Sequence, residues 1–172
     1  MSKFHDVVKN NNDEFYTPRY AIEPIVKYIP TGGVIWCPFD TEQSNYVKIF
    51  KEHGNKVIYT HINNGQDFFK INRECDYIIS NPPYSMKTEV LEKLFTQSKP
   101  FAMLLGVVGL FESKRRYNLF ANNNFEVMYF DKRIAYFKNY DDEKPSVNPP
   151  FSSVYICRDI LPNKICFEKV NK

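Results

Sequence analysis

The chain has 172 residues, of which 43% are hydrophobic and 16% aromatic, and its formal net charge is +3. This length suits one domain with a full core, and the composition favours a globular chain over a disordered one. The weak positive charge is compatible with a nucleic-acid partner and equally with none. No apolar run approaches the ~20 residues that a membrane-spanning helix needs, and residues 1–15 contain no apolar secretory signal.

The predicted elements alternate along the chain. Thr17 can cap the first helix and Pro18 can begin it. Apolar residues at helical spacing predict helices over 17–29, 44–54, 87–98 and 113–123. Apolar runs predict strands over 34–40, 56–62, 75–80, 101–110, 125–130 and 152–160. We therefore expect an α/β fold, with a mostly parallel sheet between two layers of helices. A polar loop instead of a helix joins the last two strands, which predicts an antiparallel strand at one edge.

The four cysteines do not form a recognisable metal-binding pattern. Cys37, Cys75, Cys157 and Cys166 include no CxxC pair, and no run of histidines stands near them. We therefore expect no zinc site, and a reduced, cytoplasmic protein is the simplest interpretation.

The tetrapeptide Asn81-Pro82-Pro83-Tyr84 directly follows the predicted strand at 75–80. Ligands of such sheets bind beyond the carboxyl ends of the strands. Two successive prolines remove two amide donors and leave carbonyls free to face a ligand, while Asn81 adds an acceptor and Tyr84 a flat ring. This combination suits a planar group that carries an NH₂. The alternative is a rigid turn between strand and helix, which an isolated motif of this kind would favour.

A second copy of the motif, at 148–151, stands in a different context. It follows a charged loop broken by proline and leads into a strand instead of leaving one. By itself it predicts a loop that closes back onto the sheet.

Residues 76–85, DYIISNPPYS, resemble the catalytic motif of class I S-adenosylmethionine-dependent methyltransferases, above all those that act on the N6 amine of adenine in DNA. Weaker motifs stand before and after this one, in the same order as in the family. Before it are EFYTPRYAIEPIV at 14–26, VIWCPFD at 34–40 and GQDFF at 65–69, and after it are RIAYF at 133–137 and NPPFSSVYIC at 148–157. The resemblance implies one domain with a three-layer Rossmann-like methyltransferase sheet, preceded by a partly flexible N-terminal arm at 1–16. The segment before GQDFF is too short for the usual helix and strand, which implies a sheet one strand smaller than usual.

The resemblance also implies roles at the catalytic loop. Within Asn81-Pro82-Pro83-Tyr84, the Asn81 side chain and the Pro82 carbonyl would accept hydrogen bonds from the target amine. Tyr84 would stack on the target base, which has to leave the DNA helix, and Phe151 of the second copy would contact the same base. Candidate phosphate contacts are Lys114, Arg115 and Arg116, with solvated surface charge as the alternative.

For the cofactor, S-adenosylmethionine, the resemblance implies a set of contacts spread over three segments. These are Tyr16, Thr17 and Pro18 at its methionine end, Pro38, Phe39 and Asp40 at the end of the first predicted strand, and His61, Asp67 and Phe68 toward its ribose and adenine. No metal is implied. The chain departs from the family where Thr41 and Gln43 replace the expected glycines, and where His61 replaces an acidic residue.

These departures keep two other hypotheses open. One is a methyltransferase-like binding or inhibitory protein that has lost the cofactor. The other is a methyltransferase that acts on an RNA base or a protein amide. The leading hypothesis is a small, phage-type DNA adenine-N6 methyltransferase in the cytoplasm of a bacterial or phage-infected cell. Its specificity would come from short loops, a homodimer or a separate partner, with no membrane association.

Overall fold

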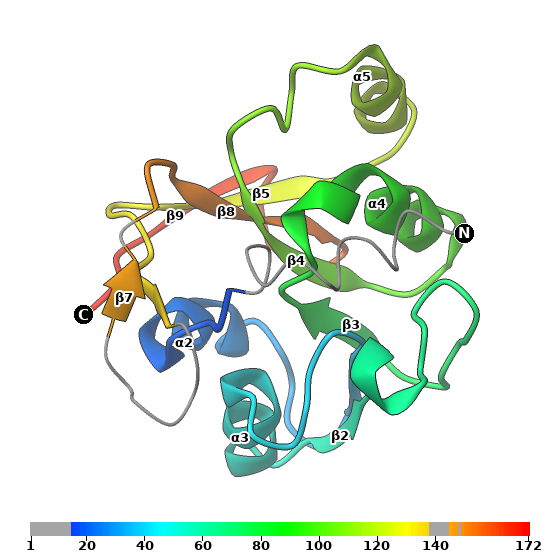
Figure 1. The fold of residues 1–172 in the computed structure, drawn as a ribbon, viewed down its shortest axis with the longest axis vertical. Helices are drawn as coiled ribbons and strands as arrows, with labels where there is room; N and C mark the ends of the chain where they lie inside the picture. The colour runs from blue at the N-terminus through cyan, green and yellow to red at the C-terminus, as the bar shows by residue number, and fades with distance from the viewer. Residues whose placement is uncertain (1–14, 138–144, 148) are drawn as a thin grey trace.

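The computed structural model describes residues 15–137, 145–147 and 149–172. Seven strands form one sheet in the order β2-β1-β3-β4-β8-β5-β9 (Figure 1). Their bounds are β1 (Val34–Cys37), β2 (Lys56–Tyr59), β3 (Tyr77–Ser80), β4 (Phe101–Gly106), β5 (Glu126–Phe130), β8 (Ser153–Arg158) and β9 (Ile165–Glu168). Every strand is parallel to its neighbours except β8, which is antiparallel to both β4 and β5.

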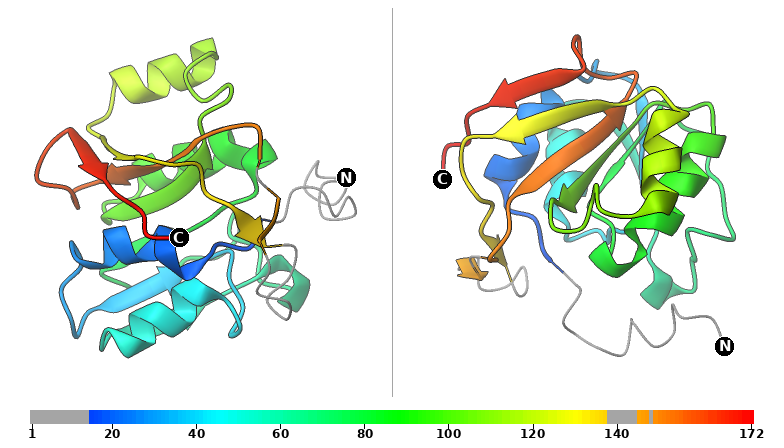
Figure 2. Two further views of the ribbon diagram at one scale, coloured as in Figure 1. Left: turned by 90° about the vertical axis from the view of Figure 1, so that its left-hand side faces the viewer. Right: turned by 90° about the horizontal axis from the view of Figure 1, so that it is seen from above.

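Helices cover both faces of the sheet, which confirms the predicted α/β architecture. They are α2 (Arg19–Val26), α3 (Asn45–Glu52), α4 (Lys87–Thr96) and α5 (Lys114–Ala121), with short 3₁₀ turns η1 (Ile62–Asn64) and η2 (Tyr84–Met86). Helices α2 and α3 pack together on one side, and α4 lies on the other with α5 beside it (Figure 1). A two-stranded ribbon, β6 (Tyr136–Phe137) and β7 (Pro145–Val147), lies to one side of the main sheet (Figure 2). No helix within the described ranges is long and apolar enough to cross a bilayer.

The core is built from apolar side chains of the central strands and the inner faces of the helices. All six residues of β4 are buried, because helices cover both faces of this central strand. On the α2 and α3 side, the Tyr155 hydroxyl lies 2.8 Å from that of Tyr46 and donates to the carbonyl of Ala21. This pair ties both helices to β8, so the sheet and its helices share one core.

Three details of the sheet differ from the sequence-based expectation. The antiparallel strand β8 lies inside the sheet, because β5 pairs with its outer side and β9 continues beyond β5. The sequence analysis did not predict β9. Residues 60–76 contain no strand, as expected, so the sheet ends at β2 on that side. It nevertheless has seven strands, because β9 adds one at the opposite edge.

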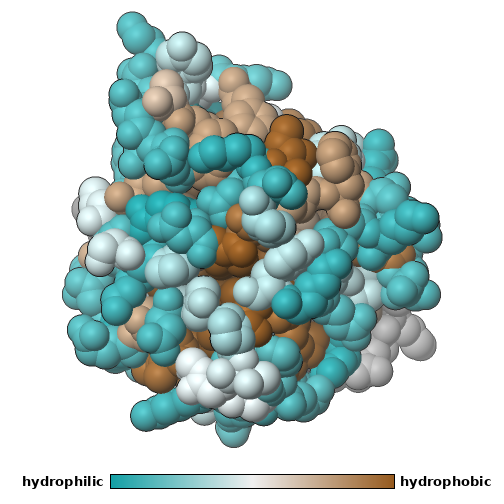
Figure 3. Space-filling model, turned by 180° about the vertical axis from the view of Figure 1, so that it is seen from behind, coloured by the Kyte–Doolittle hydropathy of each residue, from teal (hydrophilic) through white to brown (hydrophobic). Residues whose placement is uncertain are grey.

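The edge formed by β5 and β9 exposes apolar side chains on one face. Tyr129 is 47% exposed, Ile165 56% and Phe167 78%, and Tyr129 and Phe167 are paired across the two strands. Apolar surface is visible among polar side chains when the molecule is seen from behind (Figure 3). This exposure explains why β9 lacks the buried apolar run that marks the other strands.

The turn that leads from β8 to β9 is organised by a buried carboxylate. Glu126, at the start of β5, is 7% exposed and accepts hydrogen bonds from the backbone amides of Asp159, Ile160 and Leu161 at 2.8–3.0 Å. Asp159 has a positive φ of 55°. Three charge-assisted hydrogen bonds to the turn offset the cost of this backbone conformation.

We expect Glu126→Ala to lower the free energy of unfolding by about 2–4 kcal/mol, because it leaves three backbone amides without their acceptor. Glu126→Gln, which keeps one side-chain oxygen, is the matched variant and should lose about half as much. Urea denaturation of the three proteins measures the difference. Equal stability of Glu126→Ala and wild type would contradict this role.

Candidate active site

The candidate site lies where β1 and β3 end, at the carboxyl edge of the parallel strands. These two strands are neighbours, so the residues that follow them, Asp40 and Asn81, come together. The link between the two segments is Ser80, whose hydroxyl donates to Asp40 Oδ2 at 2.5 Å. Ser80 and Asp40 are both buried. The predicted catalytic loop is therefore fixed directly to the predicted cofactor loop.

The side chain of Asn81 is held in one orientation by the start of the described chain. Its amide nitrogen donates to the carbonyl of Phe15 at 2.8 Å and to Thr17 Oγ1 at 3.0 Å. The Phe15 carbonyl can only accept, so the NH₂ group must face it. Asn81 Oδ1 then points away, is shielded from solvent, and has no hydrogen-bond partner in the described part of the chain. Such acceptors are uncommon; the other among the described residues is Asn55 Oδ1, beside Gly33 at the opposite end of β1. At the ligand edge, Asn81 Oδ1 is available to accept from an N–H group of a ligand.

Four aromatic rings form a cluster beside the loop that begins at Asn81: Phe15, Tyr84, Tyr136 and Phe151. The Phe15 ring is stacked on that of Tyr84, with centroids 5.1 Å apart and planes 25° apart. The Phe151 ring meets both of these rings edge-on, with its centroid 5.6 Å from that of Tyr84 and 6.0 Å from that of Phe15. Tyr136 lies 5.2 Å from Phe15. The structure thus brings the two proline motifs together, because Tyr84 comes from the first and Phe151 from the second. Asn148 of the second motif lies outside the described residues.

Gly106, at the end of β4, allows these rings to come close. A Cβ atom at this position would lie 3.1 Å from the Phe151 ring and 3.3 Å from that of Tyr84. The two tyrosines are also fixed by their hydroxyls, since Tyr136 lies 2.6 Å from Tyr84 and 2.7 Å from Ser153 Oγ. Burial raises the pKa of the Tyr84 phenol well above its usual value. Both hydroxyls therefore stay neutral and act as positioning groups.

The first predicted cofactor segment, Tyr16, Thr17 and Pro18, lies beside the catalytic loop. Tyr16 exchanges two backbone hydrogen bonds with Phe137. Thr17 is buried, and its carbonyl accepts from the Asn45 side chain of α3 at 2.9 Å. Pro18 precedes α2 in an extended conformation. The remainder of the predicted N-terminal arm, residues 1–14, lies outside the described residues.

The second segment, Pro38, Phe39 and Asp40, follows β1. Burial raises the pKa of the Asp40 carboxyl to about 6, partly offset by hydrogen bonds from Ser80 and Ser44. The turn continues through Thr41, and Ser44 precedes α3. A buried carboxyl bonded to neutral hydroxyls suits a cationic ligand, whose charge would favour the ionised form. S-adenosylmethionine carries such charge on its sulfonium and ammonium groups, so the donor set fits this cofactor.

The third segment places Phe68 and Asp67 next to the second. Phe68 is 1% exposed and packs against Phe39 at 4.9 Å and Trp36 at 5.6 Å between ring centroids. Asp67 Oδ1 accepts from the amide of Phe69 at 3.0 Å. His61 precedes η1, and its Nδ1 accepts from the amide of Asn63. The three segments predicted to bind the cofactor therefore lie at the carboxyl edge of β1, β2 and β3.

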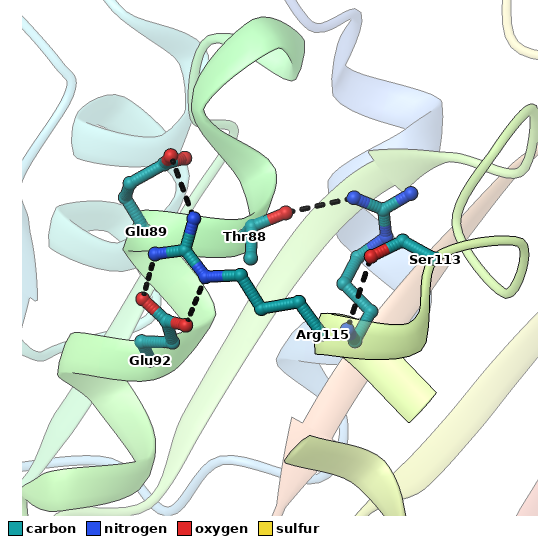
Figure 4. A network of polar contacts seen from close by, with 6 residues as sticks. Thr88, Glu89, Glu92, Ser113 and Arg115 are labelled. Atoms are coloured by element: carbon teal, nitrogen blue, oxygen red, sulfur yellow. Dashed lines mark hydrogen bonds and ion pairs between the residues drawn. The ribbon is translucent and has the colours of Figure 1, made fainter. Parts of the chain in front are cut away.

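The candidate phosphate contacts lie on α5, and the two arginines among them have partners within the chain. Arg115 forms a forked ion pair with Glu92 at 2.5 Å and lies 3.5 Å from Glu89 on α4 (Figure 4). Arg116 donates to Thr88 at 2.8 Å and to the carbonyls of Gly109 and Leu110. Lys114 is exposed at the start of the helix. Arg116 thus shapes the loop after β4, and Lys114 presents the more open charge.

Five contributors to the site were not identified from the sequence as site residues: Phe15, Ser80, Gly106, Tyr136 and Ser153. Phe15 directly precedes the predicted Tyr16-Thr17-Pro18 segment, so extending that motif by one residue would have included it. Gly106 ends a buried strand, which often marks close approach of another group. Ser80 and Ser153 carried no signal, since a serine in a strand is usually structural.

No protein-family model matches the sequence, and no curated protein matches it significantly. Among solved structures, the chain is similar to a modification subunit assigned to a type I restriction enzyme from Vibrio vulnificus YJ016, with a TM-score of 0.61 and 10% identity over 98% of this chain and 51% of that one. It is also similar to the methyltransferase subunit of a type I restriction-modification system from Streptococcus thermophilus, with a TM-score of 0.52 and 12% identity over 91% of this chain and 47% of that one. The present chain spans about half the length of each. The fold is the Rossmann-like fold of methyltransferases.

The raised pKa of Asp40 predicts a pH dependence of stability. Its folded-state pKa of about 6 lies above the ordinary value of 3.8, so the folded protein binds more protons than the unfolded chain between these values. Stability should therefore fall by up to about 3 kcal/mol as the pH rises from about 4 to about 6, and stay level above that. Asp40→Asn should remove this decline. Urea denaturation between pH 4 and pH 8 compares the two proteins, and parallel curves would contradict the assignment.

Proposed function

We propose that this chain is an S-adenosylmethionine-dependent methyltransferase that acts on the N6 amine of adenine in DNA. The observation that carries the proposal is the buried Oδ1 of Asn81, which has no partner among the described residues and lies on the loop whose Tyr84 ring packs with Phe15 and Phe151 at the ligand edge of the sheet. An exocyclic amine on a flat base supplies both the N–H donor and the ring that this arrangement lacks. The similarity to methyltransferase subunits of restriction systems supports DNA as the substrate.

The chain's own residues would position the amine and leave the chemistry to the cofactor. When bound, S-adenosylmethionine supplies an electrophilic methyl group. The Asn81 side-chain carbonyl accepts one N–H of the amine, and the Pro82 carbonyl accepts the other. Two acceptors on one side leave the nitrogen lone pair directed to the other side, for attack in line with the methyl group. Tyr84 holds the ring of the base by stacking.

The residues that would hold the cofactor lie in the three segments at the carboxyl edge. Thr17 would face its methionine end, Asp40 its positive charge, and Asp67 and Phe68 its adenine. Lys114 would contact a phosphate of the DNA, with Arg115 and Arg116 alongside it. Target choice would then depend on surface loops, a second copy or a separate specificity partner. The site would serve an enzyme in the cytoplasm of a bacterial or phage-infected cell.

A second candidate function is a methyltransferase-like binding protein without catalysis. The turn from Pro38 to Ser44 contains no glycine, so side chains replace the close backbone approach that cofactor loops use. Calorimetric titration with S-adenosylhomocysteine separates the two candidates. Saturable binding supports the enzyme, and no binding at high ligand concentration supports the second function.

We expect Asn81→Ala to lower the rate of methyl transfer to DNA by about 100-fold or more, because it removes an acceptor at the reacting nitrogen. Binding of S-adenosylhomocysteine should weaken much less than the rate does, since Asn81 reaches the predicted cofactor segment only through its hydrogen bonds to Phe15 and Thr17. Labelled cofactor with DNA, RNA and protein as acceptors measures transfer. Phe167→Ala, a truncation on the far edge of the sheet, should keep full activity. Transfer by wild type to RNA or protein alone would move the proposal to that substrate class.

Phe151→Ala should weaken the use of substrate more than the binding of cofactor. Its ring contacts Tyr84 and Phe15, on the side of the site proposed for the base. We expect KM for DNA to rise roughly tenfold, as for loss of one aromatic contact, with little change in affinity for S-adenosylhomocysteine. Equal losses in both measurements would assign Phe151 to general packing.

A further inference from the structure

The place proposed for the target base is filled by the chain itself. Tyr84 is only 9% exposed, and the ring stacked on its face is that of Phe15. Phe151 closes the site edge-on, and the Tyr136 hydroxyl meets that of Tyr84. A base can therefore stack on Tyr84 only after one of these neighbours moves.

Two of the three neighbours are firmly held. The Tyr136 hydroxyl lies between those of Tyr84 and Ser153. Phe151 lies directly over Gly106, and the next residue, Ser152, accepts a backbone hydrogen bond from Val107 at 2.9 Å. Moving either residue would break hydrogen bonds or the packing against β4.

Phe15 is held differently. Its backbone carbonyl accepts a hydrogen bond from the Asn81 amide, while within the described residues its side chain is held by contacts with the rings of Tyr84, Tyr136 and Phe151. The described chain begins at this residue and runs on through Tyr16 into α2 (dark blue in Figure 1). Rotation of the Phe15 side chain would vacate the face of Tyr84 without breaking the bond to Asn81.

We propose that Phe15 is an internal occupant of the base-binding site, and that an amine-bearing base displaces its ring on entry. This inference rests on the proposed function and adds a competing residue to it. Exchange of one stacked ring for another leaves the aromatic contacts nearly balanced. The incoming base gains in addition the hydrogen bond to Asn81 Oδ1, which Phe15 cannot make. A ring without an amine lacks this gain and displaces Phe15 less readily than adenine does.

The test uses two short single-stranded oligonucleotides, one with a single adenine among thymines and one with an abasic site in its place. Binding is measured by fluorescence anisotropy with S-adenosylhomocysteine present. Phe15→Ala should tighten binding of the adenine oligonucleotide roughly three- to tenfold, because a competing ring has been removed. Binding of the abasic oligonucleotide should not change. Phe167→Ala is the matched control, since it truncates a phenylalanine that is 78% exposed at the β9 edge.

A second variant reports the displacement directly. The chain has a single tryptophan, and it is buried against Phe68, so Phe15→Trp adds one new emission signal at the site. This signal should shift to longer wavelength when the adenine oligonucleotide binds and should stay unchanged with the abasic one. Circular dichroism confirms that each variant is folded, and Phe15→Leu replaces Phe15→Ala if the smaller residue impairs folding.

Weaker binding of adenine by Phe15→Ala would overturn the inference, because Phe15 would then be part of the substrate contact. Unchanged adenine binding, or equal tightening for both oligonucleotides, would overturn it as well. The proposed function fails separately. If Phe15→Ala tightens adenine binding but wild type transfers no methyl group, the occupant stands and the methyltransferase does not.

Discussion

The hydrogen bonds from the Asn81 amide to Phe15 and Thr17 are the interaction on which the candidate site depends. They join the start of the described chain to the end of β3, two segments more than 60 residues apart. Because the donor end of the amide is used internally, its acceptor end is directed to the interior of the site. One side chain thus fixes the N-terminal segment and sets the polarity of the pocket. Without this connection, the aromatic rings would still form an apolar cluster, but no hydrogen-bond acceptor would be held in a fixed orientation beside them.

The sheet supplies the rigidity that this arrangement needs. Asp40, Ser80 and Asn81 follow or end two adjacent strands, so their relative positions are determined by backbone pairing rather than by loops. On the other side, the antiparallel strand β8 begins at Ser153, directly after Phe151. Its start lies at the same edge of the sheet, so both side chains reach the site. Sites on strand ends are held more accurately than sites on loops alone. The α/β core therefore acts as a frame in which both proline motifs meet.

Much of this could be predicted from the sequence, for identifiable reasons. Buried strands such as Phe101–Gly106 are apolar throughout, and the Asn81-Pro82-Pro83-Tyr84 loop follows a strand end, so both the sheet and the position of the site were accessible. Strand β9 could not be predicted, because Ile165 and Phe167 are exposed and leave no buried apolar run. Its pairing also depends on a turn organised by Glu126, which lies 39 residues before Ile165. The stacking of Phe15 on Tyr84 was equally inaccessible, since it joins residues distant in sequence through ring contacts that leave no local pattern.

The close approach at Gly106 limits how this protein can diverge. A single added carbon there would press on the rings of both Tyr84 and Phe151, which belong to the two different proline motifs. A larger residue at 106 becomes tolerable only if one of those rings shrinks or shifts, and either change alters the shape of the pocket. Substitutions at positions 84, 106 and 151 are therefore expected to depend on one another. Gly106 therefore limits which residues can replace Tyr84 and Phe151.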